Sequence, residues 1–372
     1  MQYVAVFGSG FGDEGKGKVV SYLCSLNKKS LVVRFSGGQQ AGHHVMLENG
    51  SEHVFSNFGS GGLQSIPTYW TKYCTFDPVG VLNELDILKT KVNPILYVDK
   101  KCPLTTTYEK AYNIEVNKLG RKHGSCGVGV GQTFQREEDH HSILFEDIHY
   151  PSILKIKLNL LAQYYSMHLA ENHTDKFLSS CEKIRQSKNI ICCDDIYKTI
   201  EILQPSTLIF EGSQGLMLDQ NFGFFPHVTR SNTGSKNILE MGFKPEVWLV
   251  TRAYQTRHGN GPMTTEYIES KIEDNAYEKN DYNEFQGYFR KGILDLDLIN
   301  YAISKDDYIK KSPINLVVTC LDLLQDFSFM YEGELFCEYS EEDFIHILKN
   351  NIHNVKNIFI SKSPFPELTQ IK

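Results

Sequence analysis

The chain has 372 residues, enough for one large domain or two ordinary ones. Hydrophobic residues make up 41% of it and charged residues 22%, a composition that excludes disordered chains, collagen-like repeats and disulfide scaffolds. The 38 basic and 45 acidic residues leave a net charge of −7, which argues against a protein that coats nucleic acid or an anionic membrane. Any phosphate group that the protein binds must therefore be held locally.

The cysteines and the N-terminus indicate the compartment. Nine cysteines are present, none of them in a C-x-x-C pair, which favours a reducing environment. The N-terminal apolar stretch is short and has no basic region before it, as expected of a buried strand and not of a signal peptide. No apolar run approaches the roughly 18–20 residues of a membrane span. We therefore expect a cytoplasmic protein without a membrane or nucleic-acid partner.

The predicted elements alternate between strands and helices. Short runs of β-branched and aromatic residues without polar alternation are typical of strands buried on both faces of a parallel sheet. These runs lie at Tyr3–Phe7, Leu31–Phe35, Thr207–Phe210, Val247–Val250, Leu316–Thr319 and Ile358–Ile360. Candidate helices lie at Thr107–Leu119, Ser152–Ala170, Lys176–Gln186, Asp295–Ile303 and Glu341–Lys349. The pattern predicts an α/β fold, a mostly parallel central sheet with helices on both faces.

Polar, glycine-rich segments follow the predicted strands. Since ligands of open α/β sheets bind beyond the carboxyl ends of the strands, the loops after all six strands are expected to converge on one crevice. No internal repeat, low-complexity tract or linker interrupts this order. We therefore expect a single domain over residues 1–372.

The segment Gly10–Lys18, GFGDEGKGK, nearly matches the phosphate-loop pattern G-x-x-x-x-G-K-[ST] after a strand and before a helix. Glycines let backbone N–H groups close around phosphate oxygens, and the helix N-terminus adds partial positive charge. Gly17 replaces the hydroxyl residue that ordinarily holds Mg²⁺, and Asp13 adds a carboxylate to the loop. Such a carboxylate repels phosphate unless it binds a metal or moves a proton. A dinucleotide fingerprint fits less well, because its third glycine falls on Asp13.

Six motifs occur in an order that resembles the adenylosuccinate synthetase family over nearly the whole chain. They are GFGDEGKGK, GGQQAGHH, FEGSQGLMLD, FPHVTRSNT, TRHGNGPMTTE and the late LD of TCLD. The resemblance implies a fold distantly similar to the phosphate-loop nucleotide hydrolases. It also implies a ligase of purine nucleotide biosynthesis that joins IMP to L-aspartate, with GTP as co-substrate, and releases GDP and phosphate.

The chemistry of this family explains the residue types. A 6-oxo oxygen is a poor leaving group, so it must be phosphorylated before an amine can displace it. By the resemblance, Asp13 is the base that takes the ring-nitrogen proton, His43 is the acid that steadies the developing charge, and Lys16 binds phosphate. Mg²⁺ prefers oxygen ligands, and the resemblance assigns it the Asp13 carboxylate and the Gly42 carbonyl.

The binding residues carry over position by position. The GTP site is expected to contain Gly12, Asp13, Glu14, Gly15, Lys16, Gly17, Lys18, Asp322, Ser361, Lys362 and Ser363. The IMP site is expected to contain Gln40, Ala41, Gly42, His43, Ser125, Arg136, Gln214 and Thr229. The carboxylate of Asp322 would accept from the ring N–H and the exocyclic amine of guanine together, which predicts a preference for GTP over ATP.

The sequence departs from the family pattern most clearly at the amino-acid site. Only Arg290 and Lys291 remain there of the family's cation-rich loop, although each carboxylate of aspartate needs a strong cation. Arg257 and His258 are possible replacements. Arg136 is the nearest candidate for the arginine that a partner subunit lends, and Cys320 stands where the guanine motif usually has lysine.

Two alternative functions stay open, and the resemblance to the family also implies a homodimer. The same activation chemistry would serve another amine donor or another 6-oxopurine nucleotide, such as a guanine nucleotide. Phage relatives that aminate deoxyguanylate generally lack the loop aspartate, which counts against that choice. A regulator that binds nucleotide without turnover is the more remote alternative, because Asp13 and His43 are both present.

Overall fold

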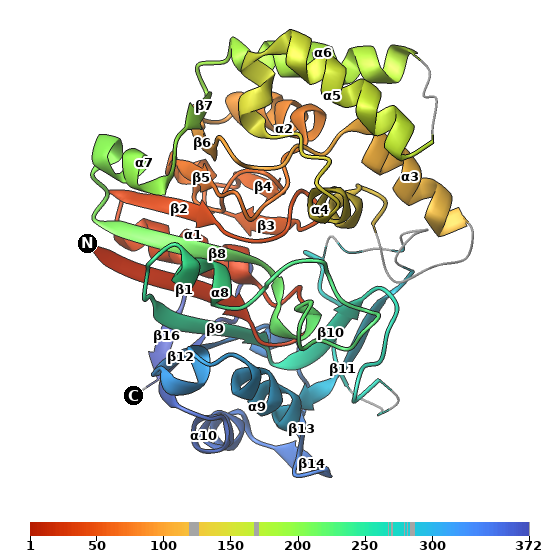
Figure 1. Ribbon diagram of the computed structural model, residues 1–372. Helices are drawn as coiled ribbons and strands as arrows, with labels where there is room; N and C mark the ends of the chain where they lie inside the picture. Colours follow the sequence, from red (N-terminus) through yellow and green to blue (C-terminus); the bar gives the residue numbers. More distant parts are fainter. Residues whose placement is uncertain are drawn as a thin grey trace.

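The computed structural model describes residues 1–118, 126–166, 171–266, 268, 271–278, 280, 282 and 287–371. Its main feature is a ten-stranded sheet in the order β16-β15-β12-β9-β1-β8-β2-β5-β6-β7 (Figure 1). All neighbours in this sheet run parallel except the edge pair β15 and β16. The predicted α/β fold with a mostly parallel central sheet is therefore confirmed.

The six predicted strands are all present and lie side by side. They form the sheet centre as β15 (Val355–Ile360), β12 (Ile314–Thr319), β9 (Glu246–Arg252), β1 (Gln2–Gly8), β8 (Thr207–Gly215) and β2 (Ser30–Arg34). Beyond them lie β5 (Thr68–Trp70), β6 (Leu96–Asp99), β7 (Ile190–Cys193) and β16 (Thr369–Ile371), which the sequence did not predict. Central strands are buried on both faces, and so their apolar runs are continuous and easy to recognise.

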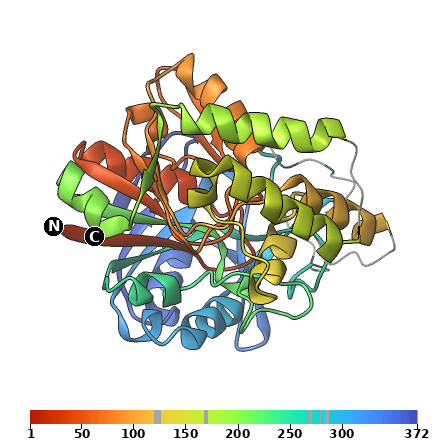
Figure 2. The same cartoon turned by 45° about the horizontal axis from the view of Figure 1, so that its top comes forward.

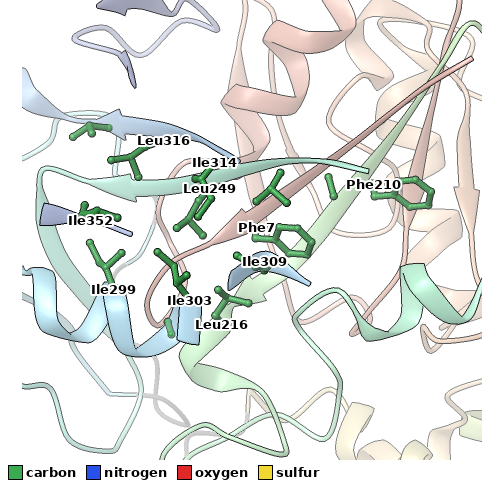
Figure 3. Close-up of a cluster of buried hydrophobic side chains, with 14 of the residues drawn as sticks. Phe7, Phe210, Leu216, Leu249, Ile299, Ile303, Ile309, Ile314, Leu316 and Ile352 are labelled. Carbon is green, nitrogen blue, oxygen red and sulfur yellow. The ribbon is translucent and has the colours of Figure 1, made fainter. Parts of the chain in front are cut away.

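The strand β1 shows how the two faces are covered. Val4 and Val6 pack in one apolar cluster with residues of α1 (Lys16–Leu26). Ala5 and Phe7 point to the opposite face, where the cluster includes residues of α9 (Leu296–Lys305). Figure 3 shows this second cluster, with Phe7, Leu249 and Leu316 of the sheet close to Ile299 and Ile303 of α9. Alternate residues of one strand thus bind helices on both sides of the sheet.

The predicted helices are present. They correspond to α3 (Thr107–Lys118), α5 (Pro151–Tyr164), α6 (Glu171–Arg185), α9 and α10 (Glu341–Asn351). Helix α5 ends at Tyr164, before its predicted end at Ala170, and α6 begins at Glu171, before its predicted start at Lys176. Leu119 and Ala170, which close two of the predicted ranges, lie outside the described residues. The helices α2 (Pro78–Lys89), α4 (Val130–Glu138), α7 (Ile196–Leu203) and α8 (Lys236–Glu240) were not predicted.

The helices divide between the two ends of the sheet. Both views place α5 and α6 at the β5–β7 end, and α9 and α10 on the opposite side of the molecule (Figures 1 and 2). The inner faces of α5 and α6 share an apolar cluster with β6 and β7. The nine cysteines are free thiols. In the part of the chain that is described, no helix is both long and apolar enough to cross a membrane.

Two smaller sheets stand beside the main one. One has the order β10-β11-β13-β14, formed by Tyr254–His258, Phe289–Asp295, Phe327–Tyr331 and Glu334–Tyr339. The other is the hairpin of β3 (His43–Met46) and β4 (Glu52–Phe55). Both matter for the site, because β10 follows β9 after a single residue and β3 begins at His43. The prediction of a single domain over the whole chain stays a prediction.

Candidate active site

Segments that follow six strands of the main sheet line one cavity of about 310 Å³. The predicted site residues among the lining are Gly12, Asp13, Glu14, Gly15, Lys16, Gly17, Lys18, Gln40, Ala41, Gly42, His43, Gln214, Asp322 and Ser363. The lining also includes Arg252, His258, Cys320 and parts of the segment 275–280. The expected convergence of loops at the carboxyl ends of the strands is therefore observed.

The phosphate loop has the backbone of an anion-binding turn. Gly12 and Gly15 have φ angles of 97° and 95°, and Asp13 lies in the left-handed region at 60°. Left-handed residues within a turn can direct neighbouring N–H groups to one side, where they can bind a phosphate. Helix α1 begins directly afterwards at Lys16 and adds its N-terminal partial charge.

Glu14 stabilises the phosphate loop by hydrogen bonds to two other residues of the same loop. Its carboxylate accepts from the backbone N–H of Gly10 at 2.7 Å and from Lys16 Nζ at 3.0 Å, and both side chains are almost fully buried. A Cβ atom at Gly8 would lie 2.0 Å from the same carboxylate, so a side chain there would displace Glu14. Glu14 thus holds the side chain of Lys16 at the base of the loop. Its main contribution to the site is to fix the shape of this loop.

Gly17, which departs from the ordinary phosphate-loop pattern, is explained by close packing. A Cβ atom at this position would lie 2.8 Å from His43 Cβ and 3.0 Å from Ser60 Oγ. Real Cβ atoms do not approach other atoms so closely. The residue type is therefore dictated by the approach of β3 to α1, which brings His43 beside the phosphate loop.

His43 forms a buried pair with Glu211, which the sequence analysis did not identify. Nδ1 of His43 lies 2.5 Å from Glu211 Oε1, whereas the buried Nε2 has no hydrogen-bond partner. Burial lowers the pKa of His43, and the Glu211 carboxylate opposes this change. A carboxylate that keeps the proton on Nδ1 leaves Nε2, on the side of the cavity, to exchange protons.

Glu211 itself is kept ionised. Burial alone raises its pKa, but the His43 bond, the charge of Arg34 and the Ser60 hydroxyl together lower it to about 2. The backbone N–H of Ser60 also donates to the second carboxylate oxygen at 3.0 Å. Glu211 comes directly after the apolar run of β8, and that position was the available signal for it.

Asp13 lies among several charges. Burial raises the pKa of its carboxyl, while Arg252 and Lys16 lower it and Glu278 raises it further. Arg252 Nε also donates to the Asp13 carbonyl at 2.5 Å, and its NH2 lies 2.8 Å from Glu278. A carboxyl with a raised pKa is a better proton acceptor when it is ionised, which suits the expected role as a base.

Two glutamines present unpartnered polar atoms to the cavity. Both amide atoms of Gln40 and the oxygen of Gln214 are buried without a hydrogen-bond partner. Both residues line the cavity. Buried polar atoms are normally paired, so these atoms indicate that a polar ligand binds here.

The opposite end of the cavity contains the predicted nucleobase residues. Asp322 lies on the turn after β12, and Lys18 Nζ donates to Ser361 Oγ at 3.1 Å and to the Ser363 carbonyl. Ser361 is buried, and its backbone N–H donates to the carbonyl of Val318. It therefore stabilises this side of the cavity without lining it. Cys320, in place of the usual lysine, also lines the cavity.

Several predicted residues lie elsewhere. Lys362 does not line the cavity and forms an ion pair with Glu341 of α10 at 2.6 Å, so its place in the GTP site stays a prediction. Thr229 does not line the cavity either, although its N–H donates to Leu218, which does. Ser125 lies outside the described residues.

Arg136 does not line the cavity either. Its guanidinium is fully buried and bonds to Glu109, to Glu137 and to the carbonyls of Leu104 and His141. Since its nitrogens are occupied by these partners, it offers no free cation to a nucleotide or to a neighbouring subunit. It holds α3 and α4 together instead.

The cations expected at the amino-acid site are engaged with protein groups. Arg290 pairs with Glu266 at 2.6 Å and Lys291 with Asp274 at 3.0 Å, and neither lines the cavity. Arg257 lies across the β10–β11 ladder from Arg290, and burial together with Arg290 lowers its pKa to about 10. Arg257 and Arg290 therefore lie close together, whereas Lys291 is bound to a different segment of the chain.

The donors available for a divalent cation are oxygen atoms. Among the described residues no group of three or more His, Cys, Asp and Glu side chains could hold a metal alone. Asp13 and Gly42, the predicted ligands, both line the cavity. One carboxylate and one carbonyl suit Mg²⁺, which binds with few protein ligands together with phosphates and water.

A family model described as adenylosuccinate synthetase matches residues 5–356. The chain belongs to the adenylosuccinate synthetase family. It is therefore an enzyme of a ligase family, as predicted. An adenylosuccinate synthetase of Francisella tularensis subsp. mediasiatica is 27% identical over 398 residues, covering 98% of this chain and 88% of the relative. One of Thermoplasma acidophilum is 29% identical over 328 residues, covering 82% and 73%.

Solved structures confirm the adenylosuccinate synthetase fold. The fully ligated adenylosuccinate synthetase of Plasmodium falciparum matches with a TM-score of 0.79 at 19% identity and covers 99% of both chains. The succinoaminodeoxyadenylate synthetase of cyanophage S-2L, bound to dGMP and dATP, matches with a TM-score of 0.68 at 16% identity, covering 99% of this chain and 95% of that one.

Proposed function

We propose that this chain joins L-aspartate to IMP with GTP as co-substrate and forms adenylosuccinate, GDP and phosphate. The observation that carries the proposal is the cavity itself. It brings together the phosphate loop, the carboxylate of Asp13 and the unpartnered Nε2 of His43. The amide atoms of Gln40 and the amide oxygen of Gln214 lie in the same cavity without a hydrogen-bond partner. Family membership supports the same reaction.

The residues act in a definite order. Asp13 takes the proton from the ring nitrogen, which makes the 6-oxygen nucleophilic toward the γ-phosphoryl group of GTP. Lys16 and the loop N–H groups bind the phosphates, and His43 Nε2 stabilises charge on the transferred group and the 6-oxygen. The aspartate amine then adds to carbon 6, and phosphate leaves with the former 6-oxygen. Mg²⁺, held by Asp13 and Gly42, would neutralise phosphate charge.

The groups around His43 determine whether its imidazole is protonated. Burial lowers the pKa of His43 in the free enzyme. Nucleotide phosphates bring negative charge to the imidazole, and negative charge favours its protonated form. Glu211 holds Nδ1 throughout, and so a proton gained on nucleotide binding resides on Nε2. His43 thereby becomes an acid only when substrates are present.

Asp322 is proposed to select GTP. It lies on the wall of the cavity that Lys18, Ser361 and Ser363 complete. A carboxylate accepts two hydrogen bonds from the guanine edge, whereas adenine lacks the ring N–H donor. The preference of this chain for GTP over ATP follows from that difference.

One observation favours an alternative in which the amine donor is a compound other than aspartate. Arg290 and Lys291 are paired with acidic side chains and do not line the cavity. An α,β-dicarboxylate needs cations that are free to bind it. If aspartate is the donor, Glu266 and Asp274 must release these cations when it binds.

We also propose a homodimer in the cytoplasm. Ile153, Ile156 and Leu160 are each at least 45% exposed and lie on one face of α5. A row of exposed apolar residues on a helix is typical of an interface. Light scattering coupled to gel filtration tests the dimer, and Ile156→Asp should shift it toward the monomer.

The proposed reaction is tested by phosphate release. Purified protein is incubated with GTP, Mg²⁺ and IMP, with and without aspartate. Release that requires both IMP and aspartate supports the proposal. Release that requires the nucleotide but not aspartate indicates another acceptor, and tight GTP binding without release would falsify the enzymatic assignment.

A further inference from the structure

The carbonyl groups of the phosphate loop have partners of their own. A turn that directs its N–H groups to a phosphate must direct the carbonyls of the same peptides away from it. Three consecutive carbonyls of this loop accept a hydrogen bond from a side chain of a different strand. The bonds are Thr256 Oγ1 to Gly12 O at 3.0 Å, Arg252 Nε to Asp13 O at 2.5 Å, and Thr319 Oγ1 to Glu14 O at 2.9 Å.

The three donors are fixed by the sheet. Arg252 ends β9 and Thr319 ends β12, and the two residues are register partners in the parallel ladder. Thr256 lies in β10, which follows β9 directly. All three side chains are buried, with exposures of 7%, 1% and 4% in that order. Their positions relative to one another therefore do not depend on a flexible segment.

Each bond orients one N–H group of the loop. The carbonyl of one residue and the N–H of the next belong to the same planar peptide and point in opposite directions. Holding the carbonyls of Gly12, Asp13 and Glu14 outward therefore holds the N–H groups of Asp13, Glu14 and Gly15 inward. The left-handed φ of Asp13, 60°, is unfavourable for a residue with a side chain and needs such support.

We propose that Arg252, Thr256 and Thr319 are positioning residues that preorganise the phosphate loop for GTP. None of the three was predicted as a site residue from the sequence. The inference rests on the proposed function only through GTP binding. The ends of β9 and β12 and the middle of β10 thereby keep the anion-binding N–H groups aligned before the nucleotide arrives.

The test removes one hydroxyl at a time. Thr256→Val and Thr319→Val keep the side-chain shape and remove the donor. Thr265→Val is the matched control, because Thr265 is also buried and donates to a carbonyl, that of Ile293 at 2.7 Å, away from the loop. GTP affinity is measured by calorimetry with Mg²⁺, and folding by thermal unfolding.

We expect the two loop variants to bind GTP about 2-fold to 12-fold more weakly, the range for one lost hydrogen bond. KM for GTP should rise in proportion while KM for IMP stays unchanged. The control should lose similar thermal stability and keep wild-type GTP affinity. Arg252→Met should lower GTP affinity further, and Arg252→Lys should recover part of it.

Two outcomes overturn the inference. One is wild-type GTP affinity in both loop variants, and the other is an equal loss of affinity in the control. The threonine variants keep the test valid if Arg252→Met does not fold. A wild-type protein that binds GTP but does not turn over IMP and aspartate contradicts the proposed function alone, because the affinity comparison can still be made.

Discussion

Replacing Glu211 by glutamine tests the His43–Glu211 pair, because the amide keeps the side-chain shape and removes the charge. In the folded protein burial raises the pKa of Glu211, but His43, Arg34 and Ser60 lower it from 4.5 to about 2. At about 1.4 kcal/mol for each pH unit between the two values, the ionised carboxylate stabilises the folded state by about 3 kcal/mol.

The sign of the pH dependence follows from the lowered pKa. The stabilisation is fully present above the pKa of the unfolded chain and is lost as the pH falls from about 4.5 to about 2. Glu211→Gln has no such titration. The difference in free energy of unfolding between wild type and variant should therefore be largest near pH 7 and shrink across this acidic window.

Urea unfolding followed by circular dichroism, at several pH values from 7 down to 3, measures that difference. Turnover should also fall, by about 100-fold, because the proton on Nδ1 of His43 is no longer held by a carboxylate. A stability difference that is constant across the pH range, or that grows in acid, refutes the stabilisation by an ionised Glu211.

Three further substitutions test other parts of the site. Asp13→Asn should abolish turnover yet raise the thermal midpoint at pH 7, since burial raises the pKa of Asp13 and its charge costs stability above that pKa; retained turnover contradicts its role as the base. Gly17→Ser, which restores the ordinary phosphate-loop hydroxyl, should cost about 1–3 kcal/mol of stability and most of the activity, because the new Cβ would lie 2.8 Å from His43 Cβ; urea unfolding and phosphate release measure both, and wild-type behaviour refutes the packing argument. Asp322→Asn should weaken GTP binding by about 10-fold and leave ATP binding unchanged, as calorimetry with each nucleotide can show; an unchanged preference removes Asp322 from the nucleobase site.

The centre of the fold was predictable because its strands are buried on both faces. Such strands contain unbroken apolar runs, as in Leu31–Phe35 and Val247–Val250. The strands β5, β6 and β7 have only three or four residues each, too few for a distinct pattern. The hairpin β3–β4 begins with two histidines and buries only every second residue. It therefore has no continuous apolar run, and its sequence is similar to that of a loop.

The site was predictable where the chemistry requires particular residue types next to each other in sequence. Asp13, Lys16 and His43 belong to motifs of that kind, and all three line the cavity. Glu211 and Arg252 act through partners that are distant in the chain, and nothing in their sequence neighbourhoods names those partners.

The same reasoning explains why two predicted cations do not line the cavity. Arg136 and Lys362 are cations at plausible positions, but a charge can equally pair with an acidic neighbour in the fold. Glu109 lies one helix away from Arg136, and Glu341 begins the helix next to Lys362. Sequence spacing alone does not show which of these partners the cation takes.

The transfer of the 6-oxygen tests the central claim most directly. IMP labelled with ¹⁸O at position 6 is incubated with the protein, GTP, Mg²⁺ and aspartate in ordinary water, and the released phosphate is analysed by mass spectrometry. If Asp13 activates the 6-oxygen for attack on the γ-phosphoryl group, the label appears in the phosphate in step with adenylosuccinate formation. Unlabelled phosphate would show that water, and not the nucleotide oxygen, accepts the phosphoryl group, and would contradict the account.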